Sequence, residues 1–188
     1  MIAESPTHPA RTGAGRLPGD LDPRQLVERM IRVDHAGEYG AVRIYEGQLA
    51  VLGRARSAPA VKKMAEQERE HLAAFADLVA DRHVRPTLLT PVWHVAGFAL
   101  GAATALISQK AAMACTVAVE EVIDRHYAGQ AAKLGDDERE LRDLIEDFRG
   151  DELEHRAQAL RHGACAPALL TGAIKAGSRL AIWLSERI

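Results

Sequence analysis

Most of the chain mixes hydrophobic and polar positions, but one internal stretch departs from this mixture. Residues 86–109 contain no Asp, Glu, Lys or Arg, and by length alone such a stretch is a transmembrane candidate. Pro91, His94, Thr104 and several small residues weaken that interpretation. We therefore expect this stretch to form a buried helix or a helix at a membrane surface.

A second unusual pattern lies at the C-terminus. Large apolar residues there, Trp183 among them, alternate with Lys175, Arg179 and Arg187. A basic amphipathic helix of this kind suits an anionic membrane surface. An ordinary packing helix gives the same pattern, so both interpretations stay open.

Start and stop signals divide the chain into six helices. Asp22 and Pro23 are a capping residue and a first-turn proline, and Gly53 ends the helix that they begin. No run of residues is typical of a strand. The predicted helices cover about residues 23–52, 57–82, 90–108, 111–134, 136–162 (with Asp136 as its cap) and 167–188.

Composition narrows the class of protein. Among the 188 residues 47% are hydrophobic but only 4% aromatic, which favours helices over sheets. The net charge of −2 gives no sign of a nucleic-acid surface. Cys115 and Cys165 form no CxxC pair, which argues against a disulfide scaffold or a zinc ribbon. Residues 1–21 lack a signal-like apolar segment and are rich in Pro and Gly, so we expect a mobile arm before a single domain over 22–188.

Two Glu-x-x-His pairs carry the candidate chemistry. They are Glu68 with His71 and Glu152 with His155, and residues three apart share one helix face. Each pair alone is also compatible with a solvated helix face. The stronger signal is a glutamate on each preceding helix, Glu38 and Glu120, at a similar distance from the intervening turn. At 1.5 Å per residue, all four glutamates lie about 20–25 Å from their hairpin ends.

Two antiparallel hairpins with this spacing bring four carboxylates and two imidazoles to one level of a four-helix bundle. This is the ligand set of a di-iron or di-manganese carboxylate site. Four buried carboxylates would be very costly without compensating charge, which two divalent cations supply. Glu68 and Glu152 are the expected bridges between the metals. The predicted metal ligands are Glu38, Glu68, His71, Glu120, Glu152 and His155.

Other side chains are expected near this site. Tyr45 and Tyr127 each lie seven residues after a predicted ligand and share its helix face, although ordinary core tyrosines fit the same positions. His126 is a candidate for proton or electron delivery, or a surface histidine. His35 lies three residues before Glu38 and competes as a ligand. The candidates to hold the ligand histidines, or to form plain surface salt bridges, are Asp34, Asp151 and more weakly Asp124.

At these residues the sequence resembles the demethoxyubiquinone hydroxylase family. The resemblance rests on MIRVDHAGEYGAVRIYEGQ at 30–48, QEREHL at 67–72, AMACTVAVEE at 113–121, DELEH at 151–155 and LAIWLSER at 180–187. It also includes the uncharged stretch, VRPTLLTPVWHVAGFALGAATALI at 84–107. All six family ligand positions hold the expected residue type.

The resemblance implies an all-α, ferritin-like four-helix bundle with two additional apolar or amphipathic helices. It implies a di-iron monooxygenase that uses O₂ to hydroxylate the ring of a demethoxyubiquinone-type polyprenyl quinol. His126 and Tyr127 would then lie beside the metals or deliver electrons. The chain contains no GxGxxG loop, so the electrons need an external donor such as NADH.

The resemblance also implies partners. The family acts at membranes because its substrate tail is insoluble, and a lipid-binding accessory protein of the same pathway commonly accompanies it. We expect the protein to bind peripherally to the cytoplasmic side of a bacterial inner membrane. A processed mitochondrial form and a homo-oligomer stay open. Three competing functions are an iron-storage or peroxide-detoxifying protein, a hydroxylase of modified tRNA and a metal-free helical scaffold. The charge of −2 counts against nucleic acid as a partner.

Overall fold

The computed structural model describes residues 21–188, and this part of the chain is built from helices without strands. The mobile arm predicted for residues 1–21 therefore lies almost wholly outside the described residues. The prediction of an all-α fold is confirmed. The helices are α1 (Pro23–Leu52), α2 (Ala58–Asp81), α3 (Thr90–Ile107), α4 (Gln109–Ala131), a short 3₁₀ turn η1 (Asp136–Glu138), α5 (Arg139–Arg161) and α6 (Ala168–Ser185).

Side-chain caps begin two of the helices, α1 and α4. The Asp22 side chain accepts a hydrogen bond from the Gln25 N–H, and the Gln25 side chain accepts one in return, which closes a capping box at α1. Ser108 is fully extended and accepts from the Ala111 N–H, so this single residue separates α3 from α4.

The predicted start of α5 was wrong. Asp136 does not cap the α-helix but begins η1, and α5 starts at Arg139. Helix α4 also ends at Ala131, before the predicted Leu134. A tight 3₁₀ turn is common at a helix N-terminus, and an acidic first turn is equally compatible with both conformations.

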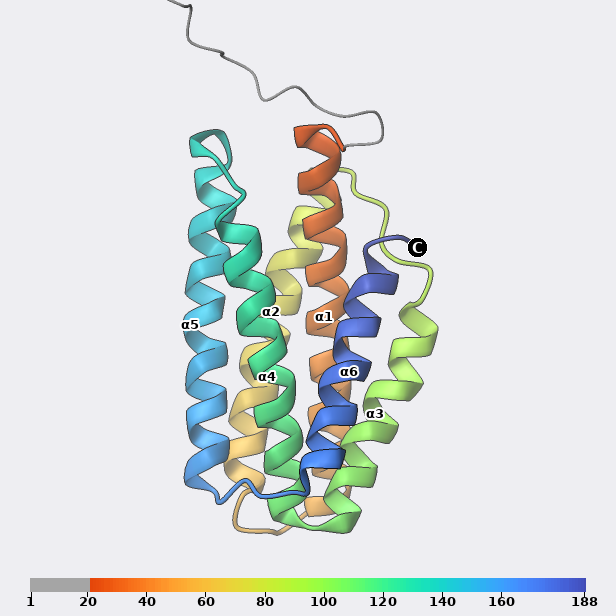
Figure 1. Cartoon of the computed structure of the whole chain (residues 1–188), viewed down its shortest axis with the longest axis vertical. Coiled ribbons are helices and arrows are strands. Elements are labelled where there is room, and N and C mark those ends of the chain that lie inside the picture. Colours follow the sequence, from red (N-terminus) through yellow and green to blue (C-terminus); the bar gives the residue numbers. More distant parts are fainter. Residues whose placement is uncertain (1–20) are drawn as a thin grey trace, which may run out of the picture.

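Two antiparallel hairpins form the core of the bundle (Figure 1). Helices α1 and α2 pack along each other, as do α4 and α5, and the hairpins face one another across the bundle. Two clusters of buried side chains fill the space between them. One contains Ile31, Phe75 and Ile145, and the other contains Met64 and Met113. The level between these clusters is where the polar ligand candidates lie.

Helices α3 and α6 form a layer outside the four-helix core (Figure 1). Helix α3 packs along α1 at very short range because both helices present glycines. A Cβ atom at Gly101 would overlap the Ile44 carbonyl oxygen, and one at Gly47 would overlap the Phe98 carbonyl oxygen. Glycine is therefore required at both positions for this backbone separation.

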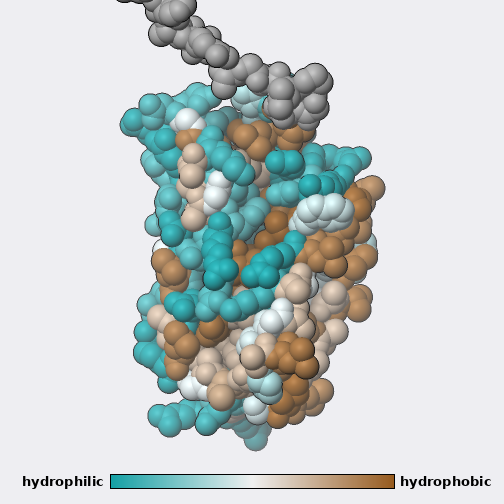
Figure 2. Space-filling view, in the orientation of Figure 1, coloured by the Kyte–Doolittle hydropathy of each residue, from teal (hydrophilic) through white to brown (hydrophobic). Residues whose placement is uncertain are grey.

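The outer face of this layer is apolar and exposed. Figure 2 shows hydrophobic residues along the edge where α3 lies. Within the described residues, α3 is the helix whose length and hydropathy would allow it to cross a membrane. Only 22% of this helix is buried. The alternative of a buried helix was therefore wrong. The large exposed hydrophobic residues of this layer are Leu88, Val92, Val95, Leu106, Ile107, Leu169, Leu180 and Trp183.

Candidate metal centre

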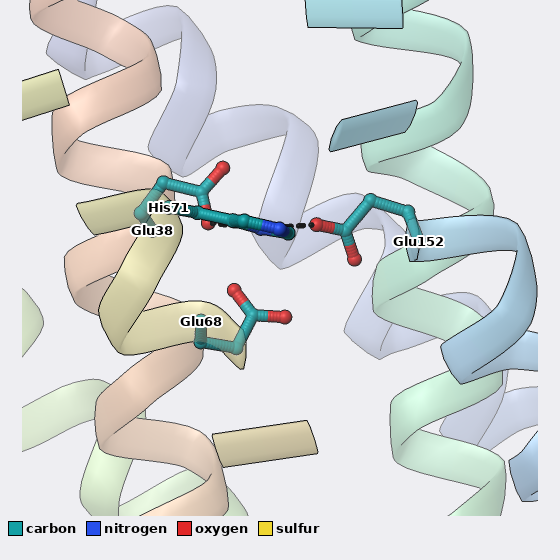
Figure 3. Close-up of side chains that lie close together, drawn as sticks. All are labelled: Glu38, Glu68, His71 and Glu152. Atoms are coloured by element: carbon teal, nitrogen blue, oxygen red, sulfur yellow. Dashed lines mark ion pairs between the residues drawn. The ribbon is translucent and has the colours of Figure 1, made fainter. Parts of the chain in front are cut away.

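The structure brings all six predicted ligand residues to one level of the bundle. Glu38 comes from α1 and Glu120 from α4, while α2 and α5 each supply one Glu-x-x-His pair. Each of the six is at most 2% exposed. Figure 3 shows four of these side chains pointing toward a common point from three helices.

The ligand atoms fall into two groups that share two carboxylates. One group holds Glu38, Glu68, His71 and Glu152, and the other holds Glu68, Glu120, Glu152 and His155. Within each group the candidate ligand atoms lie within 4.8 Å of one another. Because Glu68 and Glu152 belong to both groups, they are the two carboxylates that could bridge a pair of ions.

The two histidines present the same ring nitrogen to the centre. His71 Nδ1 lies 3.6 Å from Glu38 Oε2 and 3.4 Å from Glu152 Oε1. His155 Nδ1 lies 3.1 Å from Glu68 Oε1 and 3.2 Å from Glu152 Oε2. The Nε2 atoms point away from the centre, so each Nδ1 is the atom available to a metal.

Outer contacts fix both imidazole rings. His71 Nε2 lies 3.1 Å from Asp151 Oδ2, as predicted, but His155 Nε2 lies 3.3 Å from the side-chain oxygen of Gln67. Gln67 also donates to Asp151 over 3.3 Å. A continuous hydrogen-bonded chain therefore joins both histidines outside the centre. Sequence reasoning missed Gln67, although it directly precedes Glu68.

The other carboxylate candidates contact neither histidine. Asp34 is buried, accepts from the Gln130 side chain over 2.8 Å and lies 3.3 Å from His126 Nε2. Asp124 forms an ion pair with Arg149 over 2.6 Å. The prediction that they contact His71 or His155 was therefore wrong for both, whereas the alternative of a plain salt bridge is confirmed for Asp124.

The two tyrosines connect the hairpins. The Tyr45 hydroxyl on α1 donates to Glu120 Oε1 over 2.6 Å, and the Tyr127 hydroxyl on α4 donates to Glu38. Both rings are 2% exposed, so the prediction that they line the site is confirmed. Each tyrosine holds the glutamate of the opposite hairpin, which leaves the inner oxygens of Glu38 and Glu120 free to face the centre.

The remaining two candidates lie further out. His35 lies on α1, is half-buried and belongs to neither group of ligand atoms. His126 contacts Asp34 and Gln130 rather than any of the six predicted ligands. It directly precedes Tyr127 in α4, and both of the residues that it contacts are buried.

Burial sets the electrostatics of the site. Burial, together with the Glu152 carboxylate, raises the pKa of Glu68 and of Glu120 well above the usual range. Burial opposes ionisation of Glu152 too, but the neighbouring His155 and His71 imidazoles outweigh it and lower its pKa to about 2. Burial likewise disfavours the charged form of His71, yet Glu152 and Glu38 raise its pKa to about 10. The metal-free site therefore keeps its charge low by holding protons.

The donor set fits a pair of metal ions. Among residues 21–188, no Lys or Arg pairs with any of the four glutamates. Both Glu68 oxygens and His71 Nδ1 are buried without a hydrogen-bond partner in that part of the chain. Buried polar atoms of this kind need a partner, and an oxygen-rich set with two imidazoles suits iron or manganese.

Fold and site together define a ferritin-like helical protein with a carboxylate- and histidine-lined centre inside its bundle. Residues 25–185 match the family described as Ubiquinone biosynthesis protein COQ7, and the chain belongs to that family. The resemblance found in the sequence motifs is thereby confirmed.

Similar proteins are named as hydroxylases. The 3-demethoxyubiquinol 3-hydroxylase of Rhodospirillum rubrum is 61% identical over 183 residues, covering 95% of this chain and 86% of the relative. The human NADPH-dependent 3-demethoxyubiquinone 3-hydroxylase, mitochondrial, is 54% identical over 172 residues, or 88% and 79% of the two chains. The 5-demethoxyubiquinone hydroxylase, mitochondrial, of Saccharomyces cerevisiae is 43% identical over 183 residues, or 87% and 78%. The human relative's name specifies NADPH where we expected NADH.

Proposed function

We propose that this chain is a di-iron monooxygenase that hydroxylates the ring of a demethoxyubiquinol-type polyprenyl quinol with O₂. The observation that carries the proposal is the convergence of four buried carboxylates and two imidazoles in a member of a hydroxylase family. The names of the relatives support the quinol as substrate. The exposed apolar layer of α3 and α6 supports peripheral binding to a membrane that holds this substrate, which in a bacterium is the inner membrane.

The residues of the centre have separate roles in this proposal. Two iron ions bound there would activate O₂ for insertion into the electron-rich ring. Glu68 and Glu152 would bridge the ions, because both belong to each group of ligand atoms. Glu38 and Glu120 would each hold one ion with one oxygen while a tyrosine hydroxyl fixes the other oxygen. The protein keeps the centre dry, since the ligands are almost fully buried.

An apolar groove supports access for the quinol. Its volume is about 320 Å³, and it lies between α1, α3, α4 and α6. Gly37 and Val119 line it, and these residues directly precede Glu38 and Glu120. Gly40 also lines the groove, and no atom lies within 4 Å of the position that a Cβ would take there. An apolar ring that enters from the α3 and α6 side would thus arrive beside two of the proposed ligands.

Reduction of the centre requires an external donor. We propose NADPH, because the names of several relatives specify it. His126 and Tyr127 are the proposed route toward the centre, since Tyr127 donates to Glu38 and His126 contacts buried Asp34 beside it.

A single anaerobic experiment tests the proposed function. The protein is loaded with Fe²⁺, supplied with NADPH and a short-chain demethoxyquinol, and then exposed to O₂. We expect a product heavier by one oxygen atom, measured by mass spectrometry. Glu68→Ala should abolish both iron loading and product, because it removes a shared ligand. Glu70→Ala is the matched control on the same helix, since Glu70 is exposed and outside the centre. Full turnover by the iron-free Glu68→Ala variant would refute the proposal.

A further inference from the structure

The apolar groove between α1, α3, α4 and α6 contains few polar side chains. Among the described residues that line it, side-chain polar atoms occur in Trp93, Ser178 and Ser185. Trp93 Nε1 donates to Ser185 Oγ over 3.0 Å, so these two side chains already pair. The Ser178 hydroxyl donates to the Ile174 carbonyl oxygen over 3.0 Å within α6. A hydroxyl oxygen that donates its proton can still accept, so Ser178 offers the groove a hydrogen-bond acceptor.

Packing between α6 and α4 sets the height of Ser178 along the bundle. The two helices lie side by side and run in the same direction (Figure 1). Ile174 on α6 belongs to the same buried cluster as Val119 on α4. Ser178 follows Ile174 by about one helical turn, and Ile123, which also lines the groove, follows Val119 by about one turn. Ser178 and Ile123 therefore line the groove at a similar level.

The α1 wall of the groove at this level leads to the candidate metal centre. The position that a Cβ would take at Gly37 lies 4.0 Å from Ile123 Cδ1, so these two residues are neighbours. Gly37 lines the groove and directly precedes Glu38. The groove volume of about 320 Å³ is at the lower end of the range for small-molecule sites, which suits one substituted ring. A ring bound between Ser178 and Gly37 would thus have a polar contact on α6 and an edge beside a proposed ligand.

The oxidation state of the ring decides what it needs from the groove. A quinol carries two hydroxyl groups that can donate, whereas the corresponding quinone carries two carbonyl groups that only accept. Burying a hydroxyl in apolar surroundings without a partner is unfavourable. Because the Ser178 proton is already directed to Ile174, the Ser178 oxygen can satisfy a ring hydroxyl, whereas a ring carbonyl would have to displace the Ile174 contact.

We propose that Ser178 accepts a hydrogen bond from a ring hydroxyl and makes the groove select the quinol over the quinone. This inference rests on the proposed function for the class of ligand, and on the polar atoms of the groove for the choice between its two oxidation states. Polar groups that are few and fixed set the orientation of a ligand in an otherwise apolar pocket. A site that binds a hydroxyl also discriminates against an analogue that lacks it.

Equilibrium binding of the two oxidation states tests this assignment without turnover. A short-chain demethoxyquinol and its quinone are each titrated by isothermal calorimetry under anaerobic conditions. The full chain is loaded with Mn²⁺, which does not reduce the quinone. We expect Ser178→Ala to raise the dissociation constant of the quinol about tenfold and that of the quinone less than about twofold. Ser178→Thr keeps a hydroxyl and should retain the preference for the quinol.

Two control variants separate the contact from the groove itself. Thr171→Val removes a hydroxyl that donates to the Ala168 carbonyl oxygen over 3.1 Å on the same helix but outside the groove, and it should change neither dissociation constant. Gly40→Leu fills the groove and should weaken the binding of both ligands alike. Circular dichroism and the thermal midpoint verify that each variant is folded.

The ratio of the two dissociation constants decides the proposal. A selective loss of quinol affinity in Ser178→Ala, with recovery in Ser178→Thr, supports it. An equal change for both ligands, no change for either, or no preference in the unmodified chain overturns it. Selective quinol binding alongside failed hydroxylation would count against the proposed function alone. Hydroxylation with an unchanged ratio in Ser178→Ala would count against the role of Ser178 alone.

Discussion

Removal of metal from the centre should make the stability of the fold depend on pH in an unusual direction. Burial and neighbouring carboxylates raise the pKa of Glu68 and Glu120 well above the ordinary value of 4.5. The metal-free chain therefore takes up protons when it folds. Stabilisation from such groups is complete below pH 4.5 and is lost as pH rises toward the folded-state pKa. We thus expect the metal-free protein to become less stable as the solution becomes more alkaline.

The magnitude follows from the number of shifted groups. Each group contributes about 1.4 kcal/mol per pH unit while pH lies between its unfolded and folded pKa values, so two contribute about 2.7. Burial lowers the pKa of His35. Below pH 6.5 this residue therefore offsets up to about 1.4 kcal/mol per pH unit of the trend. His71, whose pKa rises to about 10, adds to the trend above pH 6.5, whereas Glu152 acts only below pH 4.5. The net loss is therefore about 1.4 kcal/mol per pH unit below pH 6.5 and about 4.1 above it, which corresponds to about 3–16 °C in midpoint per pH unit for a chain of this length.

Thermal unfolding of chelator-treated protein between about pH 5 and pH 8, followed by circular dichroism, measures this slope. The double variant Glu68→Gln/Glu120→Gln should reduce the slope, because neutral amides replace the carboxyls that hold protons. Metal-loaded protein should show the opposite trend, since metal binding needs deprotonated ligands. If the thermal midpoint of the metal-free protein stays constant or rises across this pH range, the electrostatic reasoning is refuted.

Three further substitutions test the groove, the histidine support and the helix packing. Gly40→Leu should keep or raise the thermal midpoint, since Leu favours a helix by about 1 kcal/mol over Gly, but it should lower quinol turnover by filling the groove. Gly150→Leu, at an exposed position of α5, is its control. Equal turnover in both variants would contradict a role for the groove. Gln67→Leu removes the partner of His155 Nε2 and should weaken Fe²⁺ binding about 10–100-fold in a competition assay, with recovery in Gln67→Glu. Gly101→Ala forces α3 away from the α1 backbone and should cost about 1–3 kcal/mol in urea unfolding; a neutral effect would contradict the close approach.

Helix positions were largely predictable from sequence because local chemistry determines them. Asp22 with Pro23, and Pro91 after Thr90, mark helix starts that the structure confirms to within a residue. The error at Asp136 shows where local signals are ambiguous, since an acidic turn suits both a 3₁₀ turn and an α-helix. The surface position of α3 was also not predictable, because an uncharged helix is equally compatible with a core and with an exposed apolar layer.

Convergence of the six candidate ligands was predictable because their spacing from the hairpin turns is nearly equal. The contacts around them depend instead on how the two hairpins rotate about each other. Sequence periodicity placed Tyr45 and Tyr127 on the correct faces, but it contained no sign that each would bind the glutamate across the bundle. Gln67 was missed for a similar reason, since its partners Asp151 and His155 come from another helix.

Each hairpin supplies a tyrosine that donates to a glutamate of the other hairpin, and this has a consequence for how the site assembles. Glu38 is oriented only when α4 is in place, and Glu120 only when α1 is in place, because each depends on a hydroxyl from the other half of the chain. Neither half can thus assemble a complete coordination sphere during synthesis. A metal ion would find its complete set of ligands only after the two halves have docked, so metal content would report a late step of folding.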